Sequence, residues 1–166
     1  ARVAVVEDGR WGGLCATVAC KPTKQLLVAA ELLHDLGAVG ADLGIEVGAV
    51  DFSLATLKAR KDWLVGTYAT WRQRFADLGL TLFDGRASFI DSGTVRVGDS
   101  TLAAERILVA TGSRTAVPPI PGIGSVAWLD HVGALELTEV PPSLLVLGAG
   151  AVGLELAQAF GRFGSR

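Results

Sequence analysis

The sequence predicts an α/β fold, chiefly because it contains two strand-to-helix units, one near each end of the chain. Val3–Val6 is a short apolar run that ends at Glu7 and leads through a glycine pair into a helical pattern. Leu144–Leu147 is a second such run, and a glycine-rich turn and another helical pattern follow it. Apolar runs of this length are typical of strands buried on both faces, as in a parallel sheet.

Composition limits the class of protein. Of the 166 residues, 50% are hydrophobic and 19% are charged, and the net charge is −2. Such a chain can bury a core, and it has no charge excess that would attract nucleic acid or an anionic membrane. The longest uncharged stretches are short and are broken by proline and glycine. With no visible targeting segment either, we expect a soluble, cytoplasmic protein without a membrane span.

Between the two units, spacing of apolar residues predicts one helix over Cys15–Leu36 and another over Leu54–Leu78, with a glycine-rich loop at 37–50. Short strands are then expected at Leu80–Phe83, Ala87–Ile90, Thr94–Val97 and Arg106–Val109. The first three of these should form a small antiparallel meander, with turns at Ser92–Gly93 and Gly98–Asp99.

Residues 112–122 contain three prolines and are expected to connect two domains. We therefore predict a first domain over residues 1–122 and the start of a second over residues 123–166. The chain has no methionine, begins with a strand pattern, and ends where a helix should lead into another strand. These features predict an internal piece of a longer protein.

Two cysteines five positions apart, Cys15 and Cys20, lie at a predicted helix start. A helix start favours the thiolate form, and a close pair in an intracellular protein is more often catalytic or metal-binding than structural. Two buried, unpaired cysteines are the alternative. A zinc site is disfavoured, because only His34 and His131 remain as imidazole ligands and neither has a characteristic spacing.

Gly148, Gly150 and Gly153 form a G-x-G-x-x-G turn between a predicted strand and a predicted helix. This context is typical of a dinucleotide site, where the glycines allow a tight turn and close approach to a pyrophosphate at the helix N-terminus. A glycine-rich packing turn is the alternative. Glu7 ends the first strand and could bind a ribose hydroxyl, although an ordinary exposed carboxylate is the default interpretation. The charged run Lys58–Asp62 is interpreted as a solvated helix face.

Four segments together resemble the FAD-dependent pyridine nucleotide–disulfide oxidoreductases. Gly12-Gly13-Leu14-Cys15, with Cys20, Pro22 and Lys24 behind it, is similar to the redox-active segment of that family. Arg106–Gly112 resembles a flavin-binding stretch, Pro118–Gly122 the crossover after it, and Gly148–Ala157 the pyridine-nucleotide turn and helix. The family has Thr, Asn, Gly and an apolar residue where this chain has Leu14, Thr17, Ala19 and Lys21.

The resemblance implies a Rossmann-like FAD-binding domain and the beginning of a second, NAD- or NADP-binding unit. It implies that Cys15 exchanges with substrate, that Cys20 lies against the flavin, and that Lys24 pairs with Glu155 near the reactive edge of the cofactor. The residues expected to contact FAD are Glu7, Gly12, Gly13, Lys24, Ala87, Thr111 and Gly112.

The function implied by the resemblance is electron transfer from NAD(P)H through FAD to a Cys15–Cys20 disulfide, and on to a small disulfide or metal-ion substrate. A homodimer is expected for the full-length protein. Two alternatives stay open: a flavoprotein whose cysteines are not a catalytic couple, and a dinucleotide-binding module with structural cysteines.

Overall fold

The computed structural model describes residues 2–166, and the first strand lies close to where the sequence places it. Strand β1 (Ala4–Glu7) pairs in parallel with β2 (Thr81–Asp84), so that Glu7 and Asp84 lie side by side at the carboxyl ends. The apolar residues of β1 are thus part of a parallel pair, which confirms the α/β class. The expectation that the strand near residue 80 joins the meander is wrong, because its partner is β1.

The meander instead consists of β3 (Ala87–Asp91), β4 (Thr94–Val97) and β5 (Ser100–Ala103), paired antiparallel in that order. Both predicted turns are confirmed. The Gly93 N–H donates to the Asp91 carboxylate at 2.8 Å, which stabilises the first turn and lowers the pKa of Asp91. The polar sequence Ser-Thr-Leu-Ala gave little indication of β5, which forms because its backbone completes the hydrogen bonds of β4.

The first predicted helix is broken in two. Helix α1 (Gly13–Thr17) ends at Thr17, and α2 (Cys20–His34) begins three residues later. A π-helical turn, η1 (Asp35–Val39), and a 3₁₀ turn, η2 (Ala41–Leu43), occupy the beginning of the predicted loop. The break separates Cys15 from Cys20, so the two cysteines lie on different helices.

The second predicted helix is also divided. Helix α3 (Leu54–Gly66) is capped by the Ser53 side chain, which accepts from the Thr56 N–H at 3.2 Å. A 3₁₀ turn, η3 (Thr67–Thr70), then leads to α4 (Trp71–Asp77). The β-branched residues Thr67 and Thr70 have hydroxyls that donate to backbone carbonyls one turn back, which favours a tighter turn here.

The last part of the chain contains a 3₁₀ turn, η4 (Ile123–Ser125), and the helices α5 (His131–Leu135) and α6 (Ala151–Phe163). Arg106–Val109 and Leu144–Leu147 are not strands, which corrects the sequence-based prediction. Leu108 and Leu145 are 90% and 85% exposed. A strand needs a neighbour to accept its hydrogen bonds, and no strand within residues 2–166 pairs with either segment.

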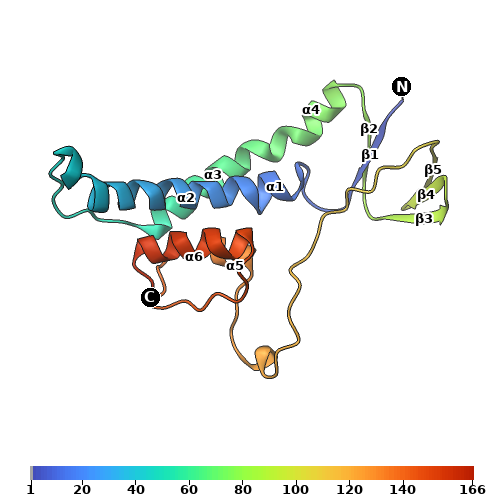
Figure 1. Ribbon diagram of the computed structural model, residues 1–166. Coiled ribbons are helices and arrows are strands. Elements are labelled where there is room, and N and C mark those ends of the chain that lie inside the picture. Colours follow the sequence, from blue (N-terminus) through green and yellow to red (C-terminus); the bar gives the residue numbers. More distant parts are fainter. Residues whose placement is uncertain (1) are drawn as a thin grey trace.

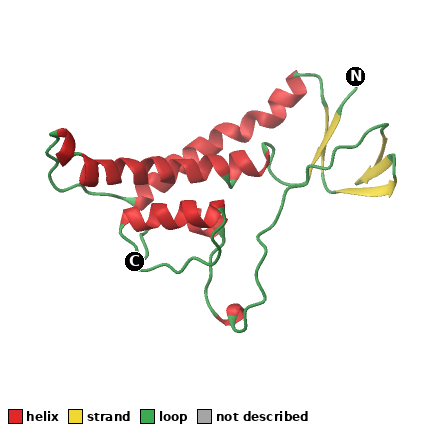
Figure 2. Ribbon diagram, in the orientation of Figure 1, coloured by secondary structure: helices red, strands yellow, loops and turns green. Residues whose placement is uncertain are grey.

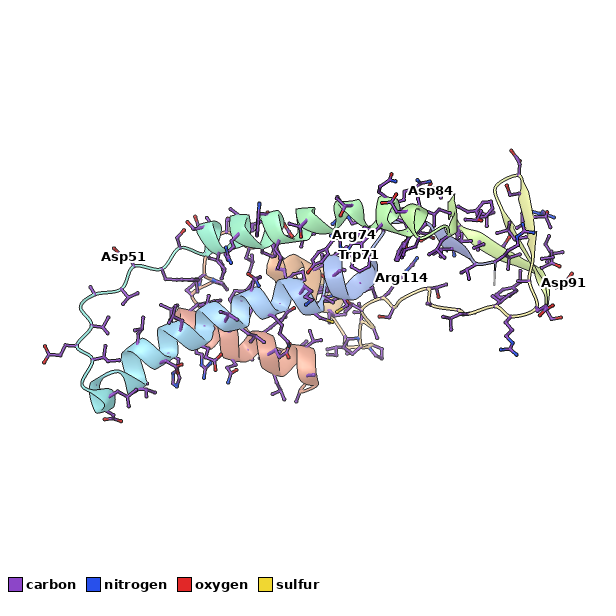
Figure 3. The ribbon with its side chains drawn as sticks, turned by 90° about the horizontal axis from the view of Figure 1, so that it is seen from above. Asp51, Trp71, Arg74, Asp84, Asp91 and Arg114 are labelled. Carbon is purple, nitrogen blue, oxygen red and sulfur yellow. The ribbon has the colours of Figure 1, made fainter. Side chains whose placement is uncertain are left out.

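The helices form one core at one end of an elongated molecule, and the strands lie at the other end (Figures 1 and 2). Helix α2 runs between α3 and α6, as the view from above also shows (Figure 3). The core contains apolar side chains from these helices and α5: Leu26, Ala30, Leu54, Ala134, Leu135, Leu156, Ala159 and Phe160. Residues on both sides of position 122 therefore share a core. Within residues 2–166, no helix has the length and apolar character that crossing a membrane demands.

Candidate functional site

The two cysteines lie on either side of the break between α1 and α2. Cys15 is in the middle of α1, and Cys20 is the first residue of α2. Both are exposed and carry free thiols. Cys20 is the main influence on the pKa of Cys15, so the two side chains are neighbours. The break therefore places two exposed thiols close together in the chain, one on each helix.

The two thiols have different electrostatic surroundings. The hydrogen bond with Cys20 raises the pKa of Cys15, although the positive charge of Lys21 opposes the shift. Cys20 occupies the N-terminus of a 15-residue helix, whose first turn has no side-chain cap. Free N–H groups and the helix dipole favour negative charge there.

The turn before the cysteines depends on glycine. Gly12 and Gly13 have φ values of 116° and 70°, a region that residues with a Cβ rarely adopt. A Cβ on Gly12 would lie 3.5 Å from Cδ1 of Trp71. Trp71 in turn packs on Phe75, with ring centroids 5.5 Å apart. The turn thus lies directly on an aromatic cluster of α4, close to the labelled Trp71 in Figure 3.

A polar contact fixes the loop before this turn. Trp11 Nε1 donates to Asp84 Oδ1 at 2.7 Å, and Arg72 Nη2 donates to Asp84 Oδ2 at 2.6 Å. The Arg72 guanidinium also lies 5.7 Å from the centre of the Trp11 ring. Arg72, followed by Trp11, lowers the pKa of Asp84. No local pattern predicts this contact, because 73 positions separate Trp11 from Asp84.

The structure places the expected flavin-binding stretch beside the redox segment. Gly112 has a φ of 75°, and a Cβ there would lie 3.0 Å from Cδ1 of Leu14. Leu14, the residue before Cys15, therefore packs on the bare backbone of Gly112. Thr111 and Gly112 are both exposed. This contact joins two segments that the resemblance assigned to the same cofactor.

Lys24 and Glu155 form an ion pair between α2 and α6. Their side chains are 51% and 33% exposed, so the pair lies at the surface. Lys24 is one helical turn beyond Cys20 on the same helix. The pairing that the resemblance implied is thus present as a contact, and it connects the first strand-to-helix unit with the second.

The turn at Gly148–Gly153 needs glycine for a steric reason at its third position. A Cβ on Gly153 would lie 2.1 Å from the Gly148 carbonyl oxygen, which is far inside contact distance. Gly150 precedes α6 as its N-cap and has open space around it. The first turn of α6 therefore lies directly against the Gly148 carbonyl, and this close approach leaves no space for a side chain at position 153.

Two further predicted residues lie near the strand ends. Glu7 is half-buried, and its Oε1 accepts from the Gly9 N–H at 2.8 Å. Ala87 begins β3 and is exposed. Neither approaches the cysteines through any contact that we find among the described residues. Their assignment to FAD stays a prediction.

A ring of four charged residues, called here the ion-pair ring, lies between α3 and the end of α5. Lys58 Nζ contacts Asp62 at 2.6 Å and Glu136 at 2.9 Å, and Lys61 Nζ contacts Asp62 at 2.8 Å and Glu136 at 2.5 Å. The Lys61 side chain is only 4% exposed, whereas that of Glu136 is 53% exposed. The prediction of a solvated helix face is therefore wrong for Lys61.

A signal for this burial existed in the sequence. Lys61 lies four positions after Leu57 and three before Leu64, on the apolar face of the predicted helix. Its partner Glu136 is 75 positions away, and no local pattern links the two. Lys58 and Lys61 lower the pKa values of both carboxylates, and both carboxylates raise the pKa of Lys58.

Histidine, cysteine and carboxylate side chains of residues 2–166 form no group of three or more that could hold a metal ion. The residues present do fit a dinucleotide. A Cβ at Gly13, Gly148 or Gly150 would meet nothing within 4 Å, so a phosphate-bearing ligand can approach the backbone closely at these positions.

Comparison with solved structures defines the class of the chain. Residues along its whole length superpose on the HOCl-induced flavoprotein disulfide reductase RclA from Escherichia coli, with a TM-score of 0.80 and 32% identity, covering 35% of that protein. A Cu(II) complex of RclA gives a TM-score of 0.78 at 33% identity, over 99% of this chain and 35% of that one. The chain therefore has the fold of a flavoprotein disulfide reductase.

Within this class, the chain belongs to the pyridine nucleotide-disulphide oxidoreductase family, whose model matches residues 1–166. Members of the family use FAD and NAD(P)H. Relatives include mercuric reductases of Streptomyces lividans, 39% identical over 99% of the chain, and Lysinibacillus sphaericus, 37% identical over 99%. A dihydrolipoamide dehydrogenase of Chaetomium thermophilum is 37% identical over 97%. The chain spans 36%, 30% and 33% of these relatives, respectively.

Proposed function

We propose that the full-length protein is an NAD(P)H-dependent FAD oxidoreductase in which Cys15 and Cys20 carry electrons to a disulfide or soft metal-ion substrate. The observation that carries the proposal is the pair of exposed free thiols on either side of the break between α1 and α2. Family membership and the names of the relatives support it: some are mercuric reductases and one is a disulfide reductase.

FAD, when bound, would supply two electrons obtained from NAD(P)H. The backbones of Gly12, Gly13 and Gly112 would lie against it, together with Thr111 and Lys24, while Glu7 and Ala87 would hold its adenosine end. The turn Gly148–Gly153 would bind the pyrophosphate of the nicotinamide nucleotide at the N-terminus of α6. These assignments are part of the proposal.

The chemistry of the thiol pair is a two-electron exchange. In the reductive half, the Cys15–Cys20 bond breaks as two electrons and two protons enter. In the oxidative half with a disulfide substrate, the Cys15 thiolate attacks one substrate sulfur and displaces the other as a thiolate, which takes up a proton. Cys20 then attacks Cys15, re-forming the internal disulfide and releasing the second substrate thiol. With a divalent soft metal ion, the two thiolates would bind it and transfer two electrons to it, so that the Cys15–Cys20 bond re-forms and the metal leaves in its zero-valent state.

The two thiols have different surroundings. Cys20 raises the pKa of Cys15, so Cys15 must give up its proton before it attacks a substrate. Cys20 begins helix α2, and a helix N-terminus favours negative charge. Lys24 lies one helical turn after Cys20 on α2 and is paired with Glu155 of α6. It therefore places a positive charge near Cys20 without a direct bond to it. Cys15 is exposed and can meet a substrate from solvent. Free thiols of this kind persist in the reducing cytoplasm, where we expect the protein to act.

Anaerobic titration of the FAD-loaded full-length protein with NAD(P)H tests the proposal. We expect a long-wavelength thiolate–flavin absorbance that is lost in Cys20→Ala and is kept in Cys15→Ala. Turnover should fall by about 10³-fold or more in either variant, because the two sulfurs act as a unit. Flavin reduction without this absorbance, or unchanged turnover in Cys15→Ser, would show that the cysteines are not the couple.

The substrate class is tested in the same protein. NADPH oxidation is measured with Hg(II) as one acceptor and with lipoamide or glutathione disulfide as others. A soft-metal reductase is expected to use Hg(II) in the presence of excess thiol, and a disulfide reductase to use one of the disulfides. Activity with neither class would contradict the proposed substrate.

A further inference from the structure

The ion-pair ring is the largest charged cluster that the proposed mechanism does not use. It contains one buried ammonium group, Lys61, and two carboxylates that each contact both lysines. Asp62 and the lysines belong to α3, whereas Glu136 is the C-cap of α5. The ring therefore joins two elements that are far apart in the chain.

The ring does not reach the thiols directly. A cavity of about 330 Å³ separates the ring from the segment between Cys15 and Cys20. Thr17 and Val18 of that segment line the cavity, and so do the ring residues Lys58, Lys61 and Glu136. Any influence on the redox site must therefore pass through packed side chains.

The core offers such a connection. Ala134 and Leu135 of α5, directly before Glu136, belong to the same buried cluster as Leu156 and Phe160 of α6. Leu156 follows Glu155, so burial of one side chain fixes the direction of the next. On α2, Leu26 is in the same core two positions after Lys24. Glu155 is thus adjacent in sequence to the buried Leu156, and Lys24 is two positions from the buried Leu26. Both members of the surface ion pair therefore lie beside the core to which α5 also belongs.

We propose that the ion-pair ring is a positioning element of the redox site: it seats α5 on α3 and thereby holds α6 so that Glu155 stays opposite Lys24. Glu136 and Lys61 are positioning residues, not catalytic ones. The inference rests on the proposed function for the role of Lys24 and Glu155, but the placement of α6 can be measured without any turnover.

The energetics of buried charge explain why the ring has two carboxylates. An ammonium group as buried as Lys61 is strongly disfavoured unless oxygen atoms surround it. Removing Glu136 leaves it with Asp62 alone, and α5 loses its polar contact with α3. Replacing both partners by apolar side chains removes the uncompensated charge and keeps a contact between the helices.

Amide hydrogen exchange on the FAD-loaded full-length protein tests the proposal. The variants are Glu136→Leu, Lys61→Met and the double variant, with Glu136→Gln as a milder change that folds more readily. Arg60→Gln is the matched control, because Arg60 is exposed on the same helix and makes no ion pair within residues 2–166. Exchange is followed in α6 and in the β3–β5 meander.

We expect α6 exchange to accelerate about tenfold or more in the single variants and to return close to the original rate in the double variant. The meander and the Arg60→Gln protein should be unchanged. In the same samples, flavin reduction by NAD(P)H should slow in Glu136→Gln and recover in the double variant. Faster exchange confined to α3 and α5, with α6 unaffected, would overturn the proposal.

The two proposals can fail separately. If α6 loosens as expected but Cys20→Ala still turns over, the proposed function is wrong and the coupling of the ring to α6 stands. If Cys20→Ala is inactive and α6 never responds to the ring, the proposed function stands and the positioning role is wrong.

Discussion

The two strand-to-helix units of the chain use glycine for different physical reasons. In the first, Gly12 and Gly13 are needed for their backbone angles, and the closest atom to a Cβ on Gly12 is 3.5 Å away. In the second, Gly153 has a helical backbone but no room at all, with a carbonyl oxygen 2.1 Å from its Cβ position. The first turn is open and leads to two exposed thiols, and the second is tight and leads to the free N–H groups of a helix.

The comparison teaches that similar glycine-rich sequences build unlike sites. The open turn allows side chains to reach a substrate, whereas the tight turn allows only backbone to meet a ligand. Two charge clusters connect the units: the surface pair Lys24–Glu155 and the ion-pair ring. Variants of the two turns and of the two charge clusters distinguish what each contributes to stability and to the proposed redox function.

Gly153→Ala should have the largest effect. Its Cβ would overlap a backbone oxygen that cannot move away as a side chain could, so the helix must shift or the turn must open. We expect a loss of about 3 kcal/mol or more in unfolding free energy, measured by urea denaturation. Gly150→Ala is the control, because its Cβ meets nothing within 4 Å. Equal losses in both variants would contradict a steric role for Gly153.

Gly12→Ala should have a smaller effect that arises from strain alone. At a φ of 116°, a residue with a Cβ costs about 1–3 kcal/mol, while Trp71 leaves enough space for the added methyl group. The same denaturation measurement checks it. A loss as large as that of Gly153→Ala would mean that the first turn is also limited by space, and the distinction between the two units would fail.

The sequence predicts those features of the fold that depend on residues close together along the chain, and it misses those that depend on residues far apart along it. β1, the turns of the meander and the glycine turn before α6 were predicted, because local periodicity and turn chemistry determine them. The pairing of β1 with β2 was missed, since it joins residues 77 positions apart. The breaks in both long helices were missed because apolar spacing continues through them.

The same rule holds for the candidate site. The spacing of Cys15 and Cys20 at a helix start indicated a reactive pair, whereas their individual roles and the pairing of Lys24 with Glu155 came only from the resemblance to a family. The ring was misjudged because the run Lys58–Asp62 looks solvated when Glu136 is not considered. Arg106–Val109 and Leu144–Leu147 have strand-like sequences, but a sequence pattern cannot supply the hydrogen-bonding neighbour that a strand needs.

Acid should weaken the connection made by the ion-pair ring. Lys58 and Lys61 lower the pKa values of Asp62 and Glu136 in the folded protein. The stability that the ring contributes is therefore fully present above the unfolded-state values, about pH 4–5, and is lost as pH falls through the lowered ones. We expect the unfolding midpoint to fall less steeply between about pH 5 and 3 in Glu136→Gln than in the unaltered protein. Parallel curves would contradict the assignment.

Lys24→Met should have the smallest effect on stability and so sharpens the comparison most. The Lys24–Glu155 pair is exposed, and exposed pairs contribute about 0.2–1 kcal/mol. We therefore expect denaturation curves close to those of the unaltered protein, while flavin reduction by NAD(P)H slows clearly, since the positive charge near Cys20 is lost. Lys58→Met removes the same type of side chain from the ion-pair ring. We expect it to lower stability more than Lys24→Met does and to slow flavin reduction less. If Lys24→Met were the more destabilising of the two, the pair would be a structural connection between the units, and its proposed part in the redox site would lose its basis.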